Sequence, residues 1–205
     1  MFCPIMVDIS NKKVLIVGGG KIAYRKAKSF LKYQASVLVV SPQFIYRFYE
    51  LKKKYRQQLT LIEDTYDPKY IDGSFLVVGA TSSRKVNEQI ALDSHRLNIL
   101  CNIVDRKEES NFISPGVVDK DGLVISISTM GKFPYLTRKI KEDIEHRYSK
   151  FDKEYLDLLE KLREIVLLKY KEKSHELFDH CIDMNKYELK EFLMELKNEN
   201  VYKGA

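Results

Sequence analysis

The sequence predicts an α/β fold built on a parallel sheet, and three features of the chain support this prediction. A buried-looking apolar run at residues 14–17 is followed by three glycines and then by a segment with apolar residues at helical spacing. Strand-like runs and helical segments then alternate as far as Asp105. This alternation favours a doubly wound sheet, and the change to two β runs and then helices beyond Asp105 indicates further regions.

The elements of the first part follow from their apolar spacing and their turn residues. An edge segment is expected at residues 4–9, ahead of a turn at 10–12. The expected strands are residues 14–17, 36–40, 59–63, 74–79 and 99–104. The expected helices are residues 21–33, 44–55 and 83–97.

The second part begins with a predicted β-hairpin. Its strands are expected at residues 112–118 and 123–128, joined by a turn at 119–122 that contains Asp121–Gly122. A loop at 129–134 and a basic helix over about 135–147 follow, and everything from Phe151 onward reads as helical. Because two strands cannot bury both faces alone, we expect a second copy of the chain to cover the hairpin.

Three regions are therefore predicted. Residues 1–112 are expected to form a nucleotide-binding domain, and residues 113–147 a dimerisation region. Residues 148–205 are expected to form an all-helical C-terminal domain. In the last of these, Phe151, Tyr155, Leu158, Leu162 and Ile165 form one apolar stripe. Asn185 and Glu188 have the spacing of a capping box at the start of the final helix.

The glycine-rich turn has the pattern G-x-G-x-x-A, formed by Gly18, Gly20 and Ala23. Between a strand and a helix, this pattern is typical of a Rossmann dinucleotide-binding site. Gly18 would allow the tight turn, Gly20 the close approach of a pyrophosphate, and Ala23 the packing of helix on strand. The free N–H groups of Lys21 and Ile22 would bind the phosphates. The alternative is a plain strand–turn–helix unit without a ligand.

Ligands of such sheets bind at the carboxyl ends of the strands. The second strand ends in Ser41 where an acidic residue usually binds the ribose diol, so the adenosine must be held by the Ser41 hydroxyl or by the backbone of Pro42 and Gln43. Nearby Arg47 raises NADP as an alternative to NAD. The remaining candidates at this edge are Thr81 and Asn102 for the cofactor and Asp105 for catalysis, with a structural cap as the alternative role of Asp105.

The composition limits the function classes. Residues 1–145 carry 23 basic and 16 acidic side chains, a balance of +7, whereas residues 146–205 carry 12 and 13, a balance of −1. A basic first part suits an anionic ligand, and no nucleic-acid motif accompanies the charge. Three scattered cysteines indicate a reducing cytoplasm, and the chain shows no secretory signal, membrane span or metal-ligand spacing. We therefore expect a cytoplasmic protein without a resident metal.

Four blocks of the chain resemble, in order and spacing, the precorrin-2 dehydrogenase family of sirohaem synthesis, which also forms the dehydrogenase/ferrochelatase part of sirohaem synthase. They are VLIVGGGKIAYRKA (14–27), ATSSRKVNEQI (80–90), CNIVDRKEESNFISPGVV (101–118) and ISISTMGKFPYLTRKIKEDIE (125–145). The resemblance covers nearly all of residues 1–145, and the chain resembles the short form, without a methyltransferase domain. Met130 and Phe133 stand where the family commonly has glycine and serine.

The resemblance implies NAD-dependent oxidation of precorrin-2 to sirohydrochlorin by a homodimer intertwined through residues 113–145, and in some members insertion of ferrous iron at the same site. It implies that Asp105, in the N-x-V-D block, is the functional aspartate, and it makes the Ser41–Pro42 strand end ordinary. Lys132 and Arg138 are candidates for binding the carboxylates of the tetrapyrrole substrate. A dinucleotide-sensing regulatory module is the alternative class, but such modules typically keep the acid that Ser41 replaces.

Overall fold

The structure is a computed structural model that describes residues 2–198. The chain divides into two compact units, Met1–Ser114 and Pro115–Ala205. The second unit holds both the hairpin region and the C-terminal helices. The predicted division of these into two separate domains stays a prediction.

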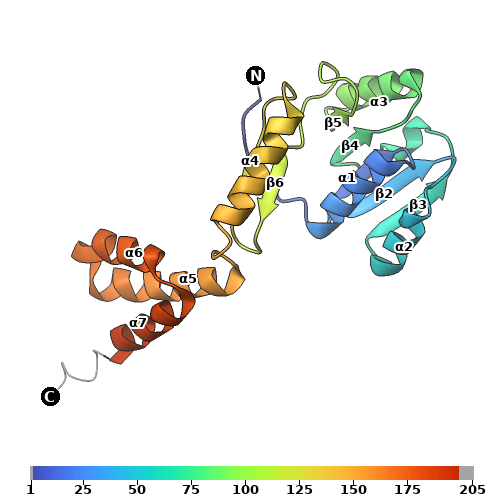
Figure 1. Cartoon of the computed structure of the whole chain (residues 1–205). Coiled ribbons are helices and arrows are strands. Elements are labelled where there is room, and N and C mark those ends of the chain that lie inside the picture. Colours follow the sequence, from blue (N-terminus) through green and yellow to red (C-terminus); the bar gives the residue numbers. More distant parts are fainter. Residues whose placement is uncertain (1, 199–205) are drawn as a thin grey trace. The chain divides into compact units, whose positions relative to one another are not determined.

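The first unit is a parallel sheet of five strands in the order β3-β2-β1-β4-β5 (Figure 1). The strands are β1 (Lys13–Val17), β2 (Ser36–Ser41), β3 (Leu59–Glu63), β4 (Leu76–Gly79) and β5 (Leu100–Ile103). The helices are α1 (Lys21–Lys32), α2 (Arg47–Lys54) and α3 (Arg84–Arg96), with a short 3₁₀ helix, η1 (Pro68–Tyr70). This order confirms the doubly wound fold, and the crossover from β3 to β4 places a topological switch point between β1 and β4.

Side chains of β1 alternate between two cores on the two faces of the sheet. Val14 and Ile16 pack with α1 and α2, whereas Leu15 and Val17 pack in the cluster that contains residues of α3. Because both faces are covered by helices, the central strands are apolar throughout, as the sequence indicated.

Three expected elements differ from the structure. Residues 4–9 form no strand. The segment expected as a helix over 44–55 is helical only over Arg47–Lys54, because Phe44 and Ile45 pack into the core and the Ile45 N–H donates to the Gly19 carbonyl at 3.0 Å. The strand expected at 112–118 begins only at Gly116, and the side chain of Asn111 binds the backbone of β5 instead.

The second unit begins with an antiparallel hairpin of β6 (Gly116–Asp119) and β7 (Val124–Ile127), followed by α4 (Pro134–Arg147). The predicted turn is present. Asp121 and Gly122 have φ values of +55° and +152°, and the Lys120 N–H donates to the Leu123 carbonyl at 3.0 Å.

The remaining helices are α5 (Lys153–Lys169), η2 (Lys171–Lys173), α6 (Ser174–Asp183) and α7 (Lys186–Asn198). The predicted stripe on α5 lines their core, with Val166 buried beside it. The capping box is confirmed, because the Asn185 N–H donates to Glu188 at 2.7 Å and the Glu188 N–H donates to the Asn185 side chain at 3.2 Å. Within residues 2–198, no helix has both the length and the apolar character needed to cross a membrane.

Candidate active site

The turn between β1 and α1 is packed tightly against the ends of two other strands. Gly18 has a φ of +127°, and a Cβ there would overlap the carbonyl of Ala80, just beyond β4. A Cβ on Gly19 would overlap the carbonyl of Gln43, just beyond β2. The first two glycines are therefore required by packing, with the left-handed backbone as an additional reason at Gly18.

Gly20 differs from its neighbours because the space beside it is open. A Cβ on Gly20 would meet no heavy atom within 4 Å, and its φ of −89° is ordinary. Gly20 is the N-cap of α1, whose end has no side-chain cap and no acidic residue in its first turn. The first N–H bonded back to it is that of Tyr24, at 3.0 Å, so the N–H groups of Lys21 and Ile22 remain for a ligand. An open glycine at an uncapped helix start fits a pyrophosphate.

The end of β2 lies beside this turn. Ser41 is buried, and its hydroxyl donates to the Gln43 carbonyl at 2.8 Å, so it orders the loop. Pro42 and Gln43 are exposed. Of the two ways suggested for holding the adenosine, this geometry favours the backbone of Pro42 and Gln43 over the Ser41 hydroxyl.

The ends of β4 and β5 are joined by Asn87, a residue that no motif of the sequence marks. The Asn87 side-chain amide accepts from the Thr81 hydroxyl at 2.8 Å and from the Thr81 N–H at 3.3 Å. It donates to the Thr81 carbonyl and to Oδ1 of Asp105, both at 3.2 Å. Asn87 is only 1% exposed, whereas Asp105 is exposed. The structure thus brings two predicted site residues, Thr81 and Asp105, onto one buried amide.

The turn that carries Asp105 is held on its other side by Ser110. The buried Ser110 hydroxyl accepts from the Ile103 N–H at 2.9 Å and donates to the Arg106 carbonyl at 3.0 Å. The Arg106 N–H in turn donates to the Ile103 carbonyl at 3.2 Å. Asp105 therefore lies in a backbone turn closed by hydrogen bonds at both ends.

A charged pair anchors the following loop to the start of α3. The Arg84 guanidinium binds both carboxylate oxygens of Glu109, with Nη1 to Oε2 at 2.8 Å. This bidentate pair fixes the segment after Asp105 relative to α3, the helix that carries Asn87.

The Asn102 side chain holds a neighbouring segment of backbone. Its side chain is nearly buried and its amide donates to the Phe112 carbonyl at 3.2 Å. Together with the Asn111 side chain, which accepts from the Cys101 N–H at 2.6 Å, it holds residues 111–112 along β5. Its predicted contact with a cofactor stays a prediction.

Burial is the main cause of the shifted pKa values of Lys26 and Cys101 in the first unit. Burial, followed by the charge of Arg25, lowers the pKa of Lys26 on α1 to about 8, so this side chain is still mostly protonated at neutral pH. Burial raises the pKa of the Cys101 thiol, which keeps it protonated and unreactive.

The two predicted substrate-binding residues lie in the second unit. Lys132 is exposed in the loop after β7, where Met130 and Gly131 both have positive φ values, +53° and +77°. Arg138 is exposed on α4, lies over the Tyr135 ring at 4.7 Å and pairs with Glu142 at 3.7 Å. Both side chains are accessible to an anionic ligand.

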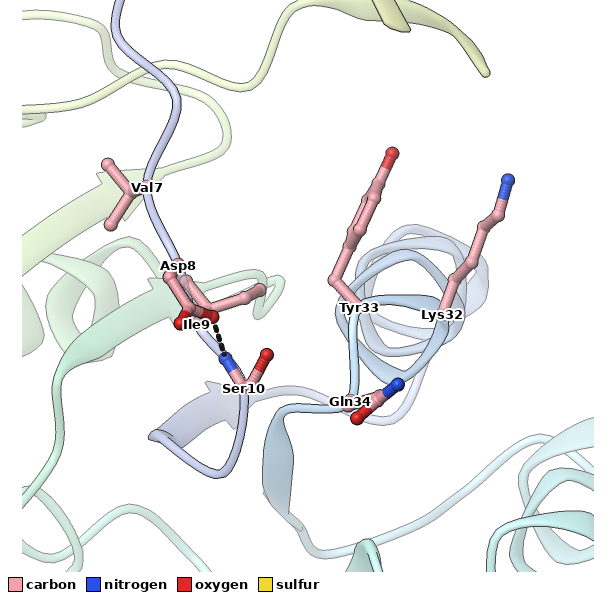
Figure 2. A pocket seen from close by; sticks show the side chains of 7 residues that line it. All are labelled: Val7, Asp8, Ile9, Ser10, Lys32, Tyr33 and Gln34. Atoms are coloured by element: carbon pink, nitrogen blue, oxygen red, sulfur yellow. Dashed lines mark hydrogen bonds between the residues drawn. The ribbon is translucent and has the colours of Figure 1, made fainter. Parts of the chain in front are cut away.

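A hollow of about 240 Å³ in the first unit lies near the amino end of β1, at the end of the strands opposite the candidate site (Figure 2). It is lined by residues that precede β1 and by the end of α1, and Figure 2 shows the Ser10 N–H donating to Asp8, at 2.9 Å. Ligands of parallel sheets bind at the carboxyl ends of the strands, so this hollow is separate from the candidate site.

Three comparisons with known proteins agree with this geometry. Residues 5–116 match a family model described as "Putative NAD(P)-binding". The chain is 37% identical over 145 residues to the siroheme synthase of Photorhabdus laumondii, covering 70% of this chain and 30% of that protein. It is 33% identical over 165 residues to siroheme synthase 1 of Aeromonas hydrophila, covering 80% of this chain and 35% of that protein. The chain thus spans about a third of the length of these relatives.

A solved structure titled "SirC, precorrin-2 dehydrogenase" matches almost the whole chain. The match has a TM-score of 0.75 and 28% sequence identity, and it covers 96% of this chain and all of the other. Together with the siroheme synthases, it confirms the resemblance drawn from the four sequence blocks. By the match over residues 5–116, more than half of its length, the chain belongs to this NAD(P)-binding family.

Proposed function

We propose that the protein is a precorrin-2 dehydrogenase, which oxidises precorrin-2 to sirohydrochlorin in sirohaem biosynthesis with NAD as the hydride acceptor. The observation that carries this proposal is the exposed Asp105 at the same carboxyl edge of the sheet as the open turn at Gly20, in a chain that is similar along its length to a precorrin-2 dehydrogenase. The balanced reaction is precorrin-2 + NAD⁺ → sirohydrochlorin + NADH + H⁺. The same similarity favours an enzyme over a dinucleotide-sensing module.

The chain's own residues would hold the cofactor along the carboxyl edge of the sheet. The Lys21 and Ile22 N–H groups would bind the pyrophosphate over Gly20, and the backbone at Pro42 and Gln43 would bind the adenosine. When bound, NAD accepts the hydride. We favour NAD over NADP because the Ser41–Pro42 strand end resembles that of NAD-dependent family members, although Arg47 lies exposed at the start of α2.

Asp105 would accept the proton that is released as the hydride leaves the substrate. Its Oδ1 is held by Asn87 at 3.2 Å, and its side chain is exposed, which leaves Oδ2 for the substrate. A positioned carboxylate of this kind typically accelerates a reaction by about 10²–10⁴-fold.

The second unit would contribute the dimer interface, and two of its exposed cations are candidates for binding the substrate. Lys132 and Arg138 would pair with carboxylates of the tetrapyrrole. None of the side chains of α4 is buried within the chain, and Tyr135, Leu136 and Ile140 are 54%, 44% and 37% exposed. An apolar helix face of this kind supports a homodimer through residues 113–145. Light scattering at micromolar concentration should give the mass of two chains, and a monomer would contradict the proposal.

We place the enzyme in the cytoplasm, on the support of three unpaired cysteines, two of them buried. The proposal is tested by anaerobic incubation of the protein with precorrin-2 and either NAD or NADP, following sirohydrochlorin and NADH by absorbance. We expect stoichiometric formation of both with NAD. Adding ferrous iron then tests chelation, because a rate no faster than in protein-free buffer would restrict the activity to dehydrogenation.

A further inference from the structure

We infer that Asn87 is a positioning residue that fixes the direction of the Asp105 carboxylate relative to the cofactor loop at Thr81. The inference rests on the proposed function for its kinetic test. Asn87 would act through Asp105 and would not itself contact the substrate, because its side chain is buried.

The four hydrogen bonds of the Asn87 amide determine its orientation. An asparagine side chain has two donor hydrogens and two acceptor lone pairs. Here the side-chain oxygen of Asn87 accepts from both the hydroxyl and the N–H of Thr81. Its NH₂ group donates one hydrogen to the Thr81 carbonyl and the other to Asp105. Rotating the amide by 180° would oppose its NH₂ group to the Thr81 N–H. The donor group is therefore kept toward Asp105.

This arrangement gives the two oxygens of Asp105 different roles. Oδ1 is occupied by the Asn87 donor at 3.2 Å, while the exposed carboxylate keeps Oδ2 accessible. Because the backbone turn around Asp105 is closed by Ser110, the backbone is fixed independently, and Asn87 is left to set the side-chain torsions. A small misplacement of a catalytic group can cost about 10²-fold in rate.

The link to Thr81 couples the carboxylate to the loop that follows β4. The Thr81 hydroxyl also lies 3.0 Å from the Ser83 carbonyl and 3.1 Å from the Ser83 N–H, so the loop itself is ordered. Asn87 thus links the ordered loop at Thr81–Ser83 to the Asp105 carboxylate through a single side-chain amide. A purely structural asparagine would serve the loop alone.

A double-mutant cycle separates these two roles. We expect Asn87→Ala to lower kcat by about tenfold or more in the wild-type background, but by less than about twofold in an Asp105→Asn background, where the proton acceptor is already lost. An equal loss in both backgrounds would overturn the inference. Ser94→Ala is the matched control, because Ser94 is a buried side chain on the same helix that donates to the Ile90 carbonyl at 2.6 Å, away from the site. It should lower the unfolding temperature and leave kcat within about twofold.

Asn87→Asp provides a second variant if Asn87→Ala does not fold. It keeps acceptor oxygens toward Thr81 but places a carboxylate against Asp105, and the two groups must either repel or share a proton. Repulsion would turn the Asp105 carboxylate away from its position, and a shared proton would already occupy it, so either result impairs its action as a proton acceptor. We expect kcat to fall by about tenfold or more while NAD affinity changes by less than about threefold. A loss of NAD affinity with unchanged kcat would overturn the inference.

A measurement without substrate distinguishes failure of this inference from failure of the proposed function. If the wild-type protein does not oxidise precorrin-2, the proposed function fails, and the side-chain amide signals of Asn87 in ¹H–¹⁵N spectra still decide the positioning. Asp105→Ala alters an exposed residue and should fold. We expect it to shift the Asn87 amide protons and to speed their exchange with solvent, and unchanged signals would overturn the inference.

Discussion

Replacing Gly20 by aspartate should abolish NAD binding while the first unit stays folded. Gly20 has an ordinary φ of −89° and open space where a Cβ would be placed, so a side chain costs little in the free protein. Aspartate is also a favourable N-cap residue. We expect the free energy of unfolding to change by less than about 1 kcal/mol.

The effect on binding follows from charge and space. A carboxylate about 5 Å from one phosphate charge, at an effective dielectric constant of about 20, costs about 3 kcal/mol. The expected loss of NAD affinity is therefore at least about 100-fold. Gly20→Asn, of the same size but uncharged, should weaken binding less, and only the aspartate variant should regain affinity as salt is added.

Gly18→Ala is the contrasting variant. It would strain a residue at φ +127° and press a methyl group into the Ala80 carbonyl. Backbone strain and overpacking each cost about 1–3 kcal/mol, so the free energy of unfolding should fall by about 2 kcal/mol or more. Calorimetric titration with NAD and thermal unfolding measure both quantities. A folded Gly20→Asp variant with NAD affinity within threefold of wild type would refute the assignment of the pyrophosphate site.

Two further predictions concern the helices after Phe151. The buried Tyr155 hydroxyl lies 2.9 Å from the Met184 carbonyl and 3.0 Å from the Cys181 carbonyl, so Tyr155→Phe should lower the free energy of unfolding by about 1–3 kcal/mol in denaturant titration, and an unchanged midpoint would count against this. The hydrogen bond from Lys186, followed by that from the Tyr155 N–H, holds the pKa of Asp152 below its ordinary value. The ionised Asp152 therefore stabilises the fold fully at pH values above the ordinary pKa, and this stabilisation is lost as the pH falls through the lowered pKa. Asp152→Asn should therefore flatten the loss of unfolding temperature on acidification below about pH 4, and an unaltered acid profile would contradict the pairing.

The parallel sheet and the alternation of its strands and helices could be predicted because strand and helix periods differ and buried parallel strands are apolar on both faces. The same reasoning found the edge where Gly20 and Asp105 lie. The strand expected from Phe112 was wrong because Asn111 and Asn102 use side-chain hydrogen bonds to hold this segment along β5. Side-chain bonds of this kind leave no periodic signal in a sequence.

Asn87 and Gly19 were missed for related reasons. Asn87 looks like one more polar residue in the first turn of a helix, and only the fold brings it to Asp105 and Thr81. The need for glycine at position 19 arises from the Gln43 carbonyl, which is distant in sequence. The one available signal was a third consecutive glycine in a motif that requires two.

Asp105 is proposed as the proton acceptor in an NAD-dependent oxidation of precorrin-2, and this role is measured by the turnover of the Asp105→Asn variant. Asparagine keeps the size of the side chain but cannot take up the proton. With saturating precorrin-2 and NAD under anaerobic conditions, we predict at least a roughly 100-fold loss of kcat for NADH formation, with NAD affinity changed by less than about threefold. A folded, dimeric Asp105→Asn enzyme with near-normal kcat would contradict the account and make Asp105 a structural cap.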